Sequence, residues 1–428
     1  MPSLKSFLEQ IASDTIIIDK KISPIYEASK ILNKADLKGT TVIFNNINGI
    51  IGKVVGNLVN TRAKLYRALN VQRDDEAYKK LIDAIEKPGH LREKNFSLKE
   101  VDVDLMSLPA LKFYELDAGR YLTSSVIIAC EEFSGEEICN ASIHRILVLG
   151  KDKAVARIVP RHLFTIVKKY SSKGKETPIA IVIGVHPSIL IASATSPPYG
   201  VFELRIAGKL YNETLHVSRT PKYNIPIPYE TSIVLEGRIT NEHVDEGPFV
   251  DITGTYDKVR KQPLIKIDAM YISDDIIGHA ILPAGNEHKI LQGFPREALI
   301  WRTVSSVVPK VYGVRLTPGG CGWLHAVIAI EKAHEGDGKN AILAAFTAHP
   351  SLKHVIVVDP DICIDDPHSI EWALATRFRA DRDLIIINNV RGSTLDPTSD
   401  DGLISKLGFD ATIPLTRRRE DFIRARIP

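Results

Sequence analysis

The stretch LTSSVIIA, residues 122–129, opens a series of short runs that are rich in β-branched residues. Turn residues separate these runs, and long helical patterns are scarce among them. Many short strands with few long helices indicate a barrel-like sheet in the middle of the chain. The runs predicted as strands are Leu122–Ala129, Ser142–Leu149, Ala154–Val159, Pro178–Val185, Phe202–Ala207, Ser232–Ile239 and Leu264–Ile272.

One helix is predicted inside this β-rich region. Pro160 suits the first turn of a helix, because its fixed backbone angle matches the helix and its missing N–H has no partner there. The helical pattern then runs to Gly174. His162 is therefore expected in the opening turn of that helix.

The flanking regions alternate helical and strand patterns, so we predict three lobes: an α/β lobe at residues 1–110, the β-rich lobe at 111–293 and a second α/β lobe at 294–428. A chain of 428 residues is long enough for more than one domain. Predicted helices are Leu4–Ile11, Pro24–Leu32, Val54–Leu69, Asp75–Ile85 and a helix capped by Asp366 and Pro367 that runs to Arg377; predicted strands are Thr40–Phe44, Val355–Val358 and Leu384–Asn388.

Composition excludes several classes of protein. A net charge of +3 is too weak a field to argue for nucleic acid, and only the tail around Arg417–Arg419 is locally basic, which suits a solvated or subunit-contacting terminus. No apolar run is long enough to span a membrane. The four cysteines lack metal or disulfide-scaffold spacing, so a reducing cytoplasm is expected, with Cys139 as a small buried thiol. Nucleotide-binding glycine motifs and the common hydrolase motifs are absent.

Polar residues in the β-rich region form a scattered constellation. Alternation along the strand places Asn140 and Ser142 on one face, and Ile143 and Arg145 on the other. An amide oxygen from Asn140, an imidazole from His162 and a carboxylate from Glu203 are a ligand set for Mn²⁺ or Mg²⁺. Three of these residues also have an ordinary interpretation. Arg145 can be a surface arginine, His162 a helix-start histidine bonded to the backbone, and Glu203 an outward-facing glutamate on a strand.

A second constellation surrounds a Gly-Pro turn. In DEGPFVD, residues 245–251, Glu246 and Asp251 lie on either side of the turn, so their side chains can converge on one cavity. Carboxylates that converge beside an arginine acquire different pKa values and can exchange protons with a substrate. An acidic surface turn is the alternative. The carbonyls and hydroxyls of Ala192, Ser193 and Thr195 suit a large monovalent ion, or form an ordinary turn.

With these residues in view, the sequence resembles the UbiD family of decarboxylases that use prenylated flavin mononucleotide (prenylated FMN). The resemblance runs from about Arg120 to Pro414 and rests on motifs in the family's order. Besides the two constellations, the motifs are Pro187–Leu190, Ser232–Gly237, Gly247–Pro248, Pro318–Cys321, Val357–Asp361 and Ser405–Ala411.

The resemblance implies an α/β fold with an N-terminal α/β lobe, a central split β-barrel of flavin-reductase type that holds the cofactor, and a C-terminal α/β oligomerisation domain. It implies that manganese is held by Asn140, His162 and Glu203 against the flavin phosphate, and potassium by Ala192, Ser193, Thr195 and Glu203. Cofactor-binding positions implied in the same way are Asn140, Ser142, Ile143, Arg145, Arg161, His162 and Lys406.

By the same resemblance, Arg145, Glu246 and Asp251 form the catalytic network. The modified flavin accepts the electrons released as CO2 leaves, and Asp251 returns a proton to the substrate carbon. Compact archaeal members are most similar, so the first predicted substrate is trans-anhydromevalonate 5-phosphate, which gives isopentenyl phosphate; the alternative is an aromatic, hydroxybenzoate-like acid. This chain has Asp245 where the family usually has proline, and Ala141–Ser142 in place of a Leu-Gly pair, which leaves the pocket shape and the substrate open.

The expected partners follow from this assignment. They are a small carboxylic acid as substrate, a flavin prenyltransferase as cofactor supplier, and further copies of the chain in a homodimer or homohexamer. Neither nucleic acid nor a membrane is expected. A noncatalytic flavin-binding subunit is the hypothesis of another class, and an intact Arg145, Glu246 and Asp251 argue against it.

Overall fold

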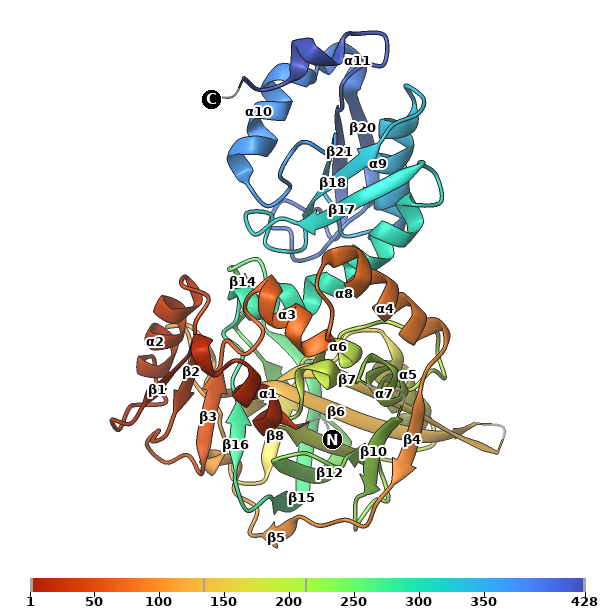
Figure 1. Cartoon of the computed structure of the whole chain (residues 1–428). Coiled ribbons are helices and arrows are strands. Elements are labelled where there is room, and N and C mark those ends of the chain that lie inside the picture. Colours follow the sequence, from red (N-terminus) through yellow and green to blue (C-terminus); the bar gives the residue numbers. More distant parts are fainter. Residues whose placement is uncertain (1–2, 134, 212–213, 426–428) are drawn as a thin grey trace. The chain divides into compact units, whose positions relative to one another are not determined.

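A computed structural model describes residues 3–133, 135–211 and 214–425 of the chain (Figure 1). Contacts divide it into two compact units. The first comprises the chain up to Val71 together with Asp83–Leu291, and the second comprises Gln72–Ile82 together with the chain from Gln292 onward. The boundaries of the three predicted lobes stay predictions.

A closed barrel of six antiparallel strands forms the core of the first unit. Around the barrel the strand order is β12, β9, β6, β7, β8 and β15, and β15 pairs with β12 to close it. The bounds are β6 Tyr121–Phe133, β7 Glu136–Val148, β8 Lys153–Ala156, β9 Thr177–Ile183, β12 Ile233–Glu246 and β15 Arg260–Ile272, with β5 Lys99–Val101 added beside β15. Six of the seven predicted strands and the predicted fold class are confirmed.

Alternate residues of these strands fill the barrel, as period-two geometry requires. Ile127, Ile181, Leu235 and Ile265 are all at most 1% exposed and belong to one buried cluster. Helix α5, His162–Ser171, packs Leu163 and Ile166 into the same cluster. The helix predicted after Pro160 is therefore confirmed, and His162 is its first residue.

The predicted strand Phe202–Ala207 is wrong. The segment is the start of helix α7, Glu203–Tyr211, in which every residue from Glu203 to Leu210 is buried except Arg205 and Lys209. The chain has apolar residues at alternate positions 202, 204 and 206, which imitates a strand, but the two less buried positions are four residues apart, as on one face of a helix. Glu203 therefore lies in the first turn of a helix.

Around the barrel, the first unit contains two smaller sheets and several helices. The mixed sheet β1-β2-β3-β16 includes Thr15–Ile18, Thr41–Phe44, Lys53–Gly56 and Ile277–His279. The sheet β11-β10-β4 includes Pro226–Pro228, Thr214–Arg219 and His90–Glu93, and β13 Phe249–Val250 pairs with β14 Tyr256–Asp257. Helical segments are α1 Leu4–Gln10, η1 Ala12–Asp14, α2 Glu27–Asp36, α3 Arg62–Leu69, η2 Leu105–Ser107 and α6 Pro187–Ser193, while α4 Asp74–Glu86 and α8 Asn286–Val304 each include residues of both units.

The predicted helix Val54–Leu69 is wrong in its first half. Residues from Lys53 to Gly56 are strand β3, and Asn57 then has a positive φ of 58°, which ends extended structure. Helix α3 begins only after Thr61, whose side chain accepts a hydrogen bond from the backbone N–H of Lys64. The cap was a local signal that the prediction overlooked.

We predicted Cys139 to be a small buried thiol, and this prediction is wrong. Cys139 forms a disulfide with Cys130. The two residues lie directly opposite each other on β6 and β7. The prediction considered only CxxC spacing and cysteine density. Cys130 and Cys139 are each three residues from Phe133 and Glu136, respectively, the last paired residues of the hairpin, and that symmetry was the signal for a cross-strand pair.

The second unit has a five-stranded mixed sheet in the order β17-β18-β19-β21-β20. Its strands are Lys310–Leu316, His325–Glu331, His354–Val358, Leu403–Ala411 and Leu384–Arg391. The helices are α9 Asp337–Ala348, α10 Pro367–Arg377, α11 Ala380–Asp383 and η3 Arg419–Phe422. The Asp366 side chain accepts from the backbone N–H groups of His368 and Ser369, so the predicted cap of α10 is confirmed.

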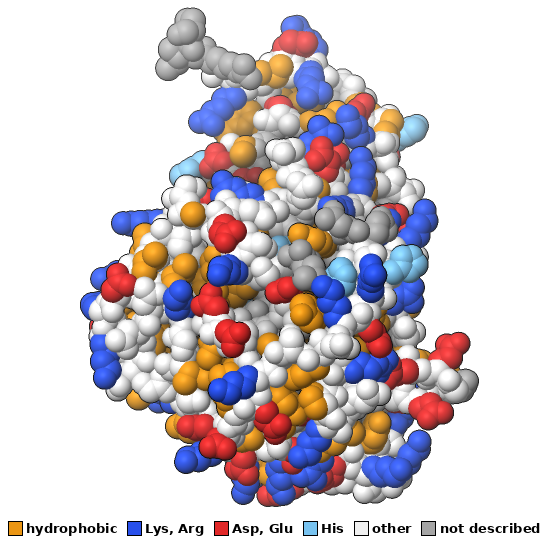
Figure 2. Space-filling view, turned by 60° about the horizontal axis from the view of Figure 1, so that its bottom comes forward, with side chains coloured by type: hydrophobic (Ala, Val, Ile, Leu, Met, Phe, Trp, Pro, Cys, Tyr) orange, Lys and Arg blue, Asp and Glu red, His pale blue; other side chains and the backbone are white. Residues whose placement is uncertain are grey.

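Charges of both signs are mixed over the surface. On the face in Figure 2, lysine and arginine side chains alternate with aspartate and glutamate rather than gathering into one basic field. No helix in the described part of the chain has both the length and the hydrophobicity that a bilayer crossing requires.

Candidate active site

Strand β7 presents a row of three polar side chains. Asn140, Ser142 and His144 are two residues apart, so they share one face of the strand. The Ser142 hydroxyl donates to Asn140 Oδ1 at 3.0 Å and lies 2.9 Å from His144 Nε2. His144 Nδ1 lies 3.0 Å from the carbonyl oxygen of Arg157, and burial lowers the pKa of His144 to about 4. The imidazole is thus neutral and holds the serine in place.

Glu203 reaches this row from the first turn of α7. Its Oε1 accepts from Asn140 Nδ2 at 2.8 Å, and its Oε2 accepts from the backbone N–H of Ala141 at 2.7 Å. The residue is only 2% exposed, which excludes the outward-facing alternative. Burial raises the pKa of Glu203 to about 7 despite these hydrogen bonds. A nearby cation would favour the ionised carboxylate.

His162 lies on the other side of Glu203. Its Nδ1 is 4.0 Å from Glu203 Oε1, and its ring makes an edge-on contact with Tyr199 at 5.3 Å between centroids. No residue in the described ranges hydrogen-bonds to the ring, so it is not a helix-start histidine satisfied by the backbone. Burial and the neighbouring Arg161 lower the pKa of His162, which keeps the imidazole in its neutral, metal-ligating form.

These three residues, Asn140, His162 and Glu203, are called the ligand group below. The structure brings them together from β7, α5 and α7. Its donors are an amide, an imidazole and a carboxylate, and the buried carboxylate forms no ion pair with a lysine or arginine among the described residues. This donor set fits a divalent cation of the Mn²⁺ or Mg²⁺ type.

Three of the four residues implied for potassium lie at the end of α6 and just after it, and the fourth, Glu203, is on α7. The Ser193 hydroxyl is buried without a hydrogen-bond partner in the described part of the molecule. The Thr195 hydroxyl donates to the Ala192 carbonyl at 2.6 Å. A buried hydroxyl without a partner is available as a ligand to a cation.

Arg145 lies at the centre of the second group. It contacts both oxygens of Glu246 at 2.9 Å each, Asp251 Oδ2 at 2.9 Å and Asp257 Oδ2 at 2.9 Å. Its side chain is 10% exposed, so it is not a surface arginine. The four residues Arg145, Glu246, Asp251 and Asp257 are called the arginine network.

The hairpin geometry explains this convergence. Glu246 ends β12, the cis peptide Gly247–Pro248 follows, and Asp251 comes directly after β13. Glu246 is fully buried, whereas the Asp251 side chain is 20% exposed. Burial opposes the charge of Arg145, but hydrogen bonds and attraction from Glu246, Asp251 and Asp257 raise its pKa above its usual range. The guanidinium therefore stays charged beside an accessible carboxyl group.

Three further residues are implied as cofactor-binding positions, and they belong to neither group. Ile143 is partly buried on β7, and Arg161 is the N-cap residue of α5 and donates to the Ser196 hydroxyl at 3.1 Å. Lys406 belongs to the second unit, on β21, where its ammonium donates to the carbonyl of Pro350 at 2.7 Å. Burial lowers the pKa of Lys406 to about 8.

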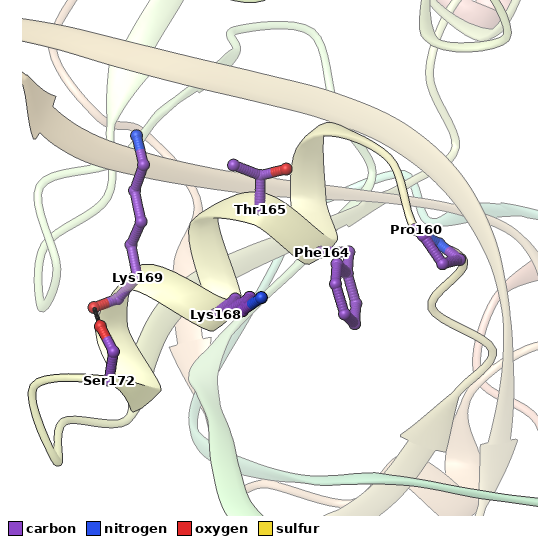
Figure 3. Close-up of a pocket in the computed structure, with 6 residues that line it drawn as sticks. All are labelled: Pro160, Phe164, Thr165, Lys168, Lys169 and Ser172. Atoms are coloured by element: carbon purple, nitrogen blue, oxygen red, sulfur yellow. Dashed lines mark hydrogen bonds between the residues drawn. The ribbon is translucent and has the colours of Figure 1, made fainter.

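A pocket beside α5 is separate from both groups. Its lining residues are Pro160, Phe164, Thr165, Lys168, Lys169 and Ser172. In Figure 3, Thr165 and Lys169 project from one side of the helix and Phe164 from the other. None of the ligand group or of the arginine network lines it, so the pocket contributes nothing to the site.

Sequence reasoning missed Asp257, Arg157 and Tyr199. Asp257 lies on β14 and becomes a partner of Arg145 only through the β13–β14 hairpin. Tyr199 hydrogen-bonds to Glu131 as well as contacting His162. The hairpin turn between Asp251 and Asp257 was the single local signal available.

Comparison with known families covers nearly the whole chain. Three domains described for 3-octaprenyl-4-hydroxybenzoate carboxy-lyase match: the N-terminal domain at residues 9–85, the Rift-related domain at 84–286 and the C-terminal domain at 289–411. The chain belongs to the UbiD family. The predicted family is confirmed.

Within the UbiD family, the chain is similar to two curated proteins and to one enzyme of solved structure over nearly its whole length. The anhydromevalonate phosphate decarboxylase of Aeropyrum pernix is 48% identical over 427 residues, which is 100% of this chain and 96% of that protein. The protein of the same name from Methanosarcina mazei is 46% identical over 96% of this chain and 95% of its own length. The solved UbiD-class enzyme HmfF from Pelotomaculum thermopropionicum, in complex with FMN, is 37% identical with a TM-score of 0.95, over 100% of this chain and 97% of that one.

Proposed function

We propose that this UbiD-family protein decarboxylates trans-anhydromevalonate 5-phosphate to isopentenyl phosphate and CO2. Relatives named anhydromevalonate phosphate decarboxylase, at 43–48% identity, support the substrate. The observation that carries the proposal is the arginine network, in which a charged guanidinium holds a partly exposed carboxyl group beside two buried ones. A noncatalytic flavin-binding subunit has no need of such a network.

Asp251 is the proton donor in this proposal. Its Oδ2 faces Arg145 Nη1, while its Oδ1 accepts from the backbone N–H of Ile252 at 2.7 Å. Both oxygens are thus oriented, and the side chain is still accessible. General acids fixed in this way commonly accelerate a reaction by about 10²- to 10⁴-fold.

Arg145 and Glu246 position this acid. Glu246 accepts from Nε and Nη2 of the guanidinium in a bidentate contact, which sets the plane in which Nη1 meets Asp251. Phe249 lies under the guanidinium, 5.0 Å from its ring centre to Arg145 Cζ. Arg145 can therefore orient either the acid or a substrate carboxylate without changing its own conformation.

We propose prenylated FMN as the cofactor, with Mn²⁺ at the ligand group and K⁺ at Ala192, Ser193, Thr195 and Glu203. The donor sets fit these ions, and solved structures of the UbiD-class enzyme HmfF are complexes with FMN or prenylated FMN. Ser142, Ile143, Arg161 and His162 are the further cofactor contacts in this proposal, all in the first unit; Lys406, in the second unit, stays a prediction from the family resemblance. When bound, the modified flavin supplies an electron sink for the electrons released as CO2 leaves.

The aromatic-acid decarboxylase is the second candidate. A gallate decarboxylase from Lactiplantibacillus plantarum is 28% identical over 91% of this chain. That identity is well below the values for the archaeal relatives, which favours the phosphorylated substrate.

The test is CO2 release from purified holoenzyme, produced together with a flavin prenyltransferase. Trans-anhydromevalonate 5-phosphate and a panel of hydroxybenzoates are assayed side by side. We expect turnover of the phosphate ester only, and none in protein made without the prenyltransferase. Turnover of a hydroxybenzoate alone would favour the second candidate, and no turnover of any acid by protein that carries the cofactor would favour the binding subunit.

Assembly and location are further proposals. We propose a cytoplasmic homodimer or homohexamer formed through the C-terminal lobe. Light scattering of the holoenzyme after size-exclusion chromatography measures the mass directly, and a mass of one chain would contradict the assembly.

A further inference from the structure

Three arginines lie side by side at one end of the barrel. Arg145 is on β7, Arg157 directly follows β8, and Arg260 begins β15, and these three strands are neighbours in the sheet. Since Ile146 pairs with Ala156, Arg157 lies opposite Arg145, and its backbone N–H donates to the Arg145 carbonyl. Arg260 pairs with Glu246 across β15 and β12. The arginines therefore border the arginine network from adjacent strands.

All three guanidinium groups face a single carboxylate, Asp257. Arg145 Nη2 lies 2.9 Å from Asp257 Oδ2, and Arg260 Nη1 donates to Asp257 Oδ1. Arg157 Nε is 3.7 Å from the same Oδ2, which is beyond hydrogen-bonding distance. Arg145 has Glu246 and Asp251 as further partners, whereas Arg157 has no second carboxylate among the described residues.

Arg157 is thus under-compensated. None of the described residues accepts a hydrogen bond from its guanidinium, although five N–H groups in a planar fork are available there. Burial lowers the pKa of Arg157, and repulsion from Arg260 lowers it further. Its side chain is 22% exposed and that of Arg260 is 29% exposed, so a solute can reach both.

With all groups ionised, Arg145, Arg157 and Arg260 equal Glu246, Asp251 and Asp257 in number, so the case for a further ligand rests on geometry. The carboxylates lie at hydrogen-bonding distance from Arg145 and Arg260, whereas Arg157 has only the 3.7 Å contact with Asp257.

We propose that Arg157, with Arg260 beside it, is the subsite for the phosphate monoester of the substrate. This inference rests on the proposed function, since it assumes a substrate with a phosphate as well as a carboxylate. The planar fork of arginine matches the oxygens of a phosphate in a bidentate contact. Asp257 then keeps the two arginines apart and oriented, while Arg145 and Asp251 act at the carboxylate end.

The decisive experiment compares two substrates in the holoenzyme of Arg157→Gln. With trans-anhydromevalonate 5-phosphate we expect KM to rise about 10- to 100-fold, because a charge-assisted contact is lost. With trans-anhydromevalonate, which lacks the phosphate, kcat/KM should stay within about twofold of the unmodified protein. Arg157→Lys, which keeps the charge but not the fork, should recover part of the loss.

Lys261→Gln is the matched control. Lys261 follows Arg260 on β15, but it pairs with the exposed Asp245, and both side chains are more than half exposed. The Lys261→Gln substitution removes one positive charge, as Arg157→Gln does, without altering a contact of Asp257. KM for both substrates should therefore not change. An equal loss on both substrates in Arg157→Gln would mean that Arg157 merely supports Asp257, and that result would overturn the subsite.

A binding experiment separates failure of the subsite from failure of the proposed function. Isopentenyl phosphate is titrated calorimetrically into the unmodified holoenzyme and into Arg157→Gln. If the unmodified protein does not turn over the phosphate substrate, the proposed function fails. Weaker binding to the variant still supports a phosphate subsite, while equal binding, or no binding to either protein, overturns it.

Discussion

The ligand group and the arginine network compensate buried charge in opposite ways. In the arginine network, Glu246, Asp251 and Asp257 each contact the Arg145 guanidinium at 2.9 Å. In the ligand group, Glu203 is only 2% exposed, but its only basic neighbour within 4 Å among the described residues is His162, at 4.0 Å. The pKa of Glu203 is accordingly raised to about 7 by burial, and that of Arg145 is raised by its anionic neighbours.

The difference indicates two kinds of site. A network whose charged side chains contact one another is oriented before any ligand arrives, which suits proton transfer. A buried carboxylate beside an amide and a neutral imidazole is completed by a cation from outside the chain. Catalysis and cofactor retention should therefore be separable by mutation.

Asp251→Asn is expected to have the largest effect. The variant keeps the shape of the side chain but cannot donate the proton, so kcat should fall about 10²- to 10⁴-fold. Flavin absorbance and manganese content of the purified protein should not change, because the ligand group is untouched. Asp245→Asn is the control, since Asp245 lies on the same hairpin with a side chain that is 61% exposed. Near-normal turnover in Asp251→Asn would remove Asp251 from the mechanism.

Glu203→Gln tests the other half of the comparison. Removing the charge should weaken Mn²⁺ binding by at least about 100-fold, since changes to mere outer-shell partners of metal ligands already cost about 10- to 100-fold. Manganese and flavin per chain are measured after dialysis at graded Mn²⁺ concentrations. Glu242→Gln, at an exposed position on β12, should retain both. Full manganese occupancy of Glu203→Gln at low Mn²⁺ would show that the carboxylate is not a ligand.

Lys64 is a cationic counterpart of Glu203. It is 1% exposed, and its ammonium donates to neutral oxygens of Gly39, Thr41 and Asn60 at 2.7 to 2.8 Å. Burial lowers the pKa of Lys64 to about 8. In the unfolded chain a lysine has a pKa of about 10.4, so between these values the unfolded state binds more protons and stability rises with pH.

Lys64→Met should abolish this dependence. Relative to the variant, the unmodified protein should gain about 2 kcal/mol of stability between pH 7.5 and 9.5. The measurement is the midpoint of urea unfolding at both pH values. Thr41→Val removes an acceptor but no titrating group, so it should keep the slope. Parallel curves for Lys64→Met and the unmodified protein would contradict the buried-charge argument.

Local signals accounted for the parts of the fold that were predicted correctly. Asp366 caps α10 with its own side chain and Pro367 takes the first helical position, so no distant contact is needed to interpret them. Pro160, in contrast, lies two residues before the first residue of α5 and not in its first turn, where we predicted it. The segment after Phe202 failed because alternate apolar residues satisfy a strand as well as a helix. Only the surfaces that α7 packs against decide between the two.

The candidate site could be predicted only where the family resemblance reached. Arg145, Glu246 and Asp251 were found by motif, whereas Asp257, Arg157 and Arg260 were not. Their proximity depends on the register of β7, β8 and β15, and the pairing of β8 with β15 joins residues more than a hundred positions apart. A single sequence contains no direct record of that register.

Tyr199 offers the smallest and sharpest test of the ligand group. Its ring contacts His162 edge-on, while its hydroxyl hydrogen-bonds to Glu131, which also pairs with Lys169 at 2.7 Å. If the ring orients the imidazole, Tyr199→Ala should weaken Mn²⁺ binding by about 2- to 10-fold, since aromatic contacts contribute about 0.5–1.5 kcal/mol. Tyr199→Phe keeps the ring and should change the affinity less than twofold. The reverse order would mean that the hydroxyl, through Glu131, positions His162 instead.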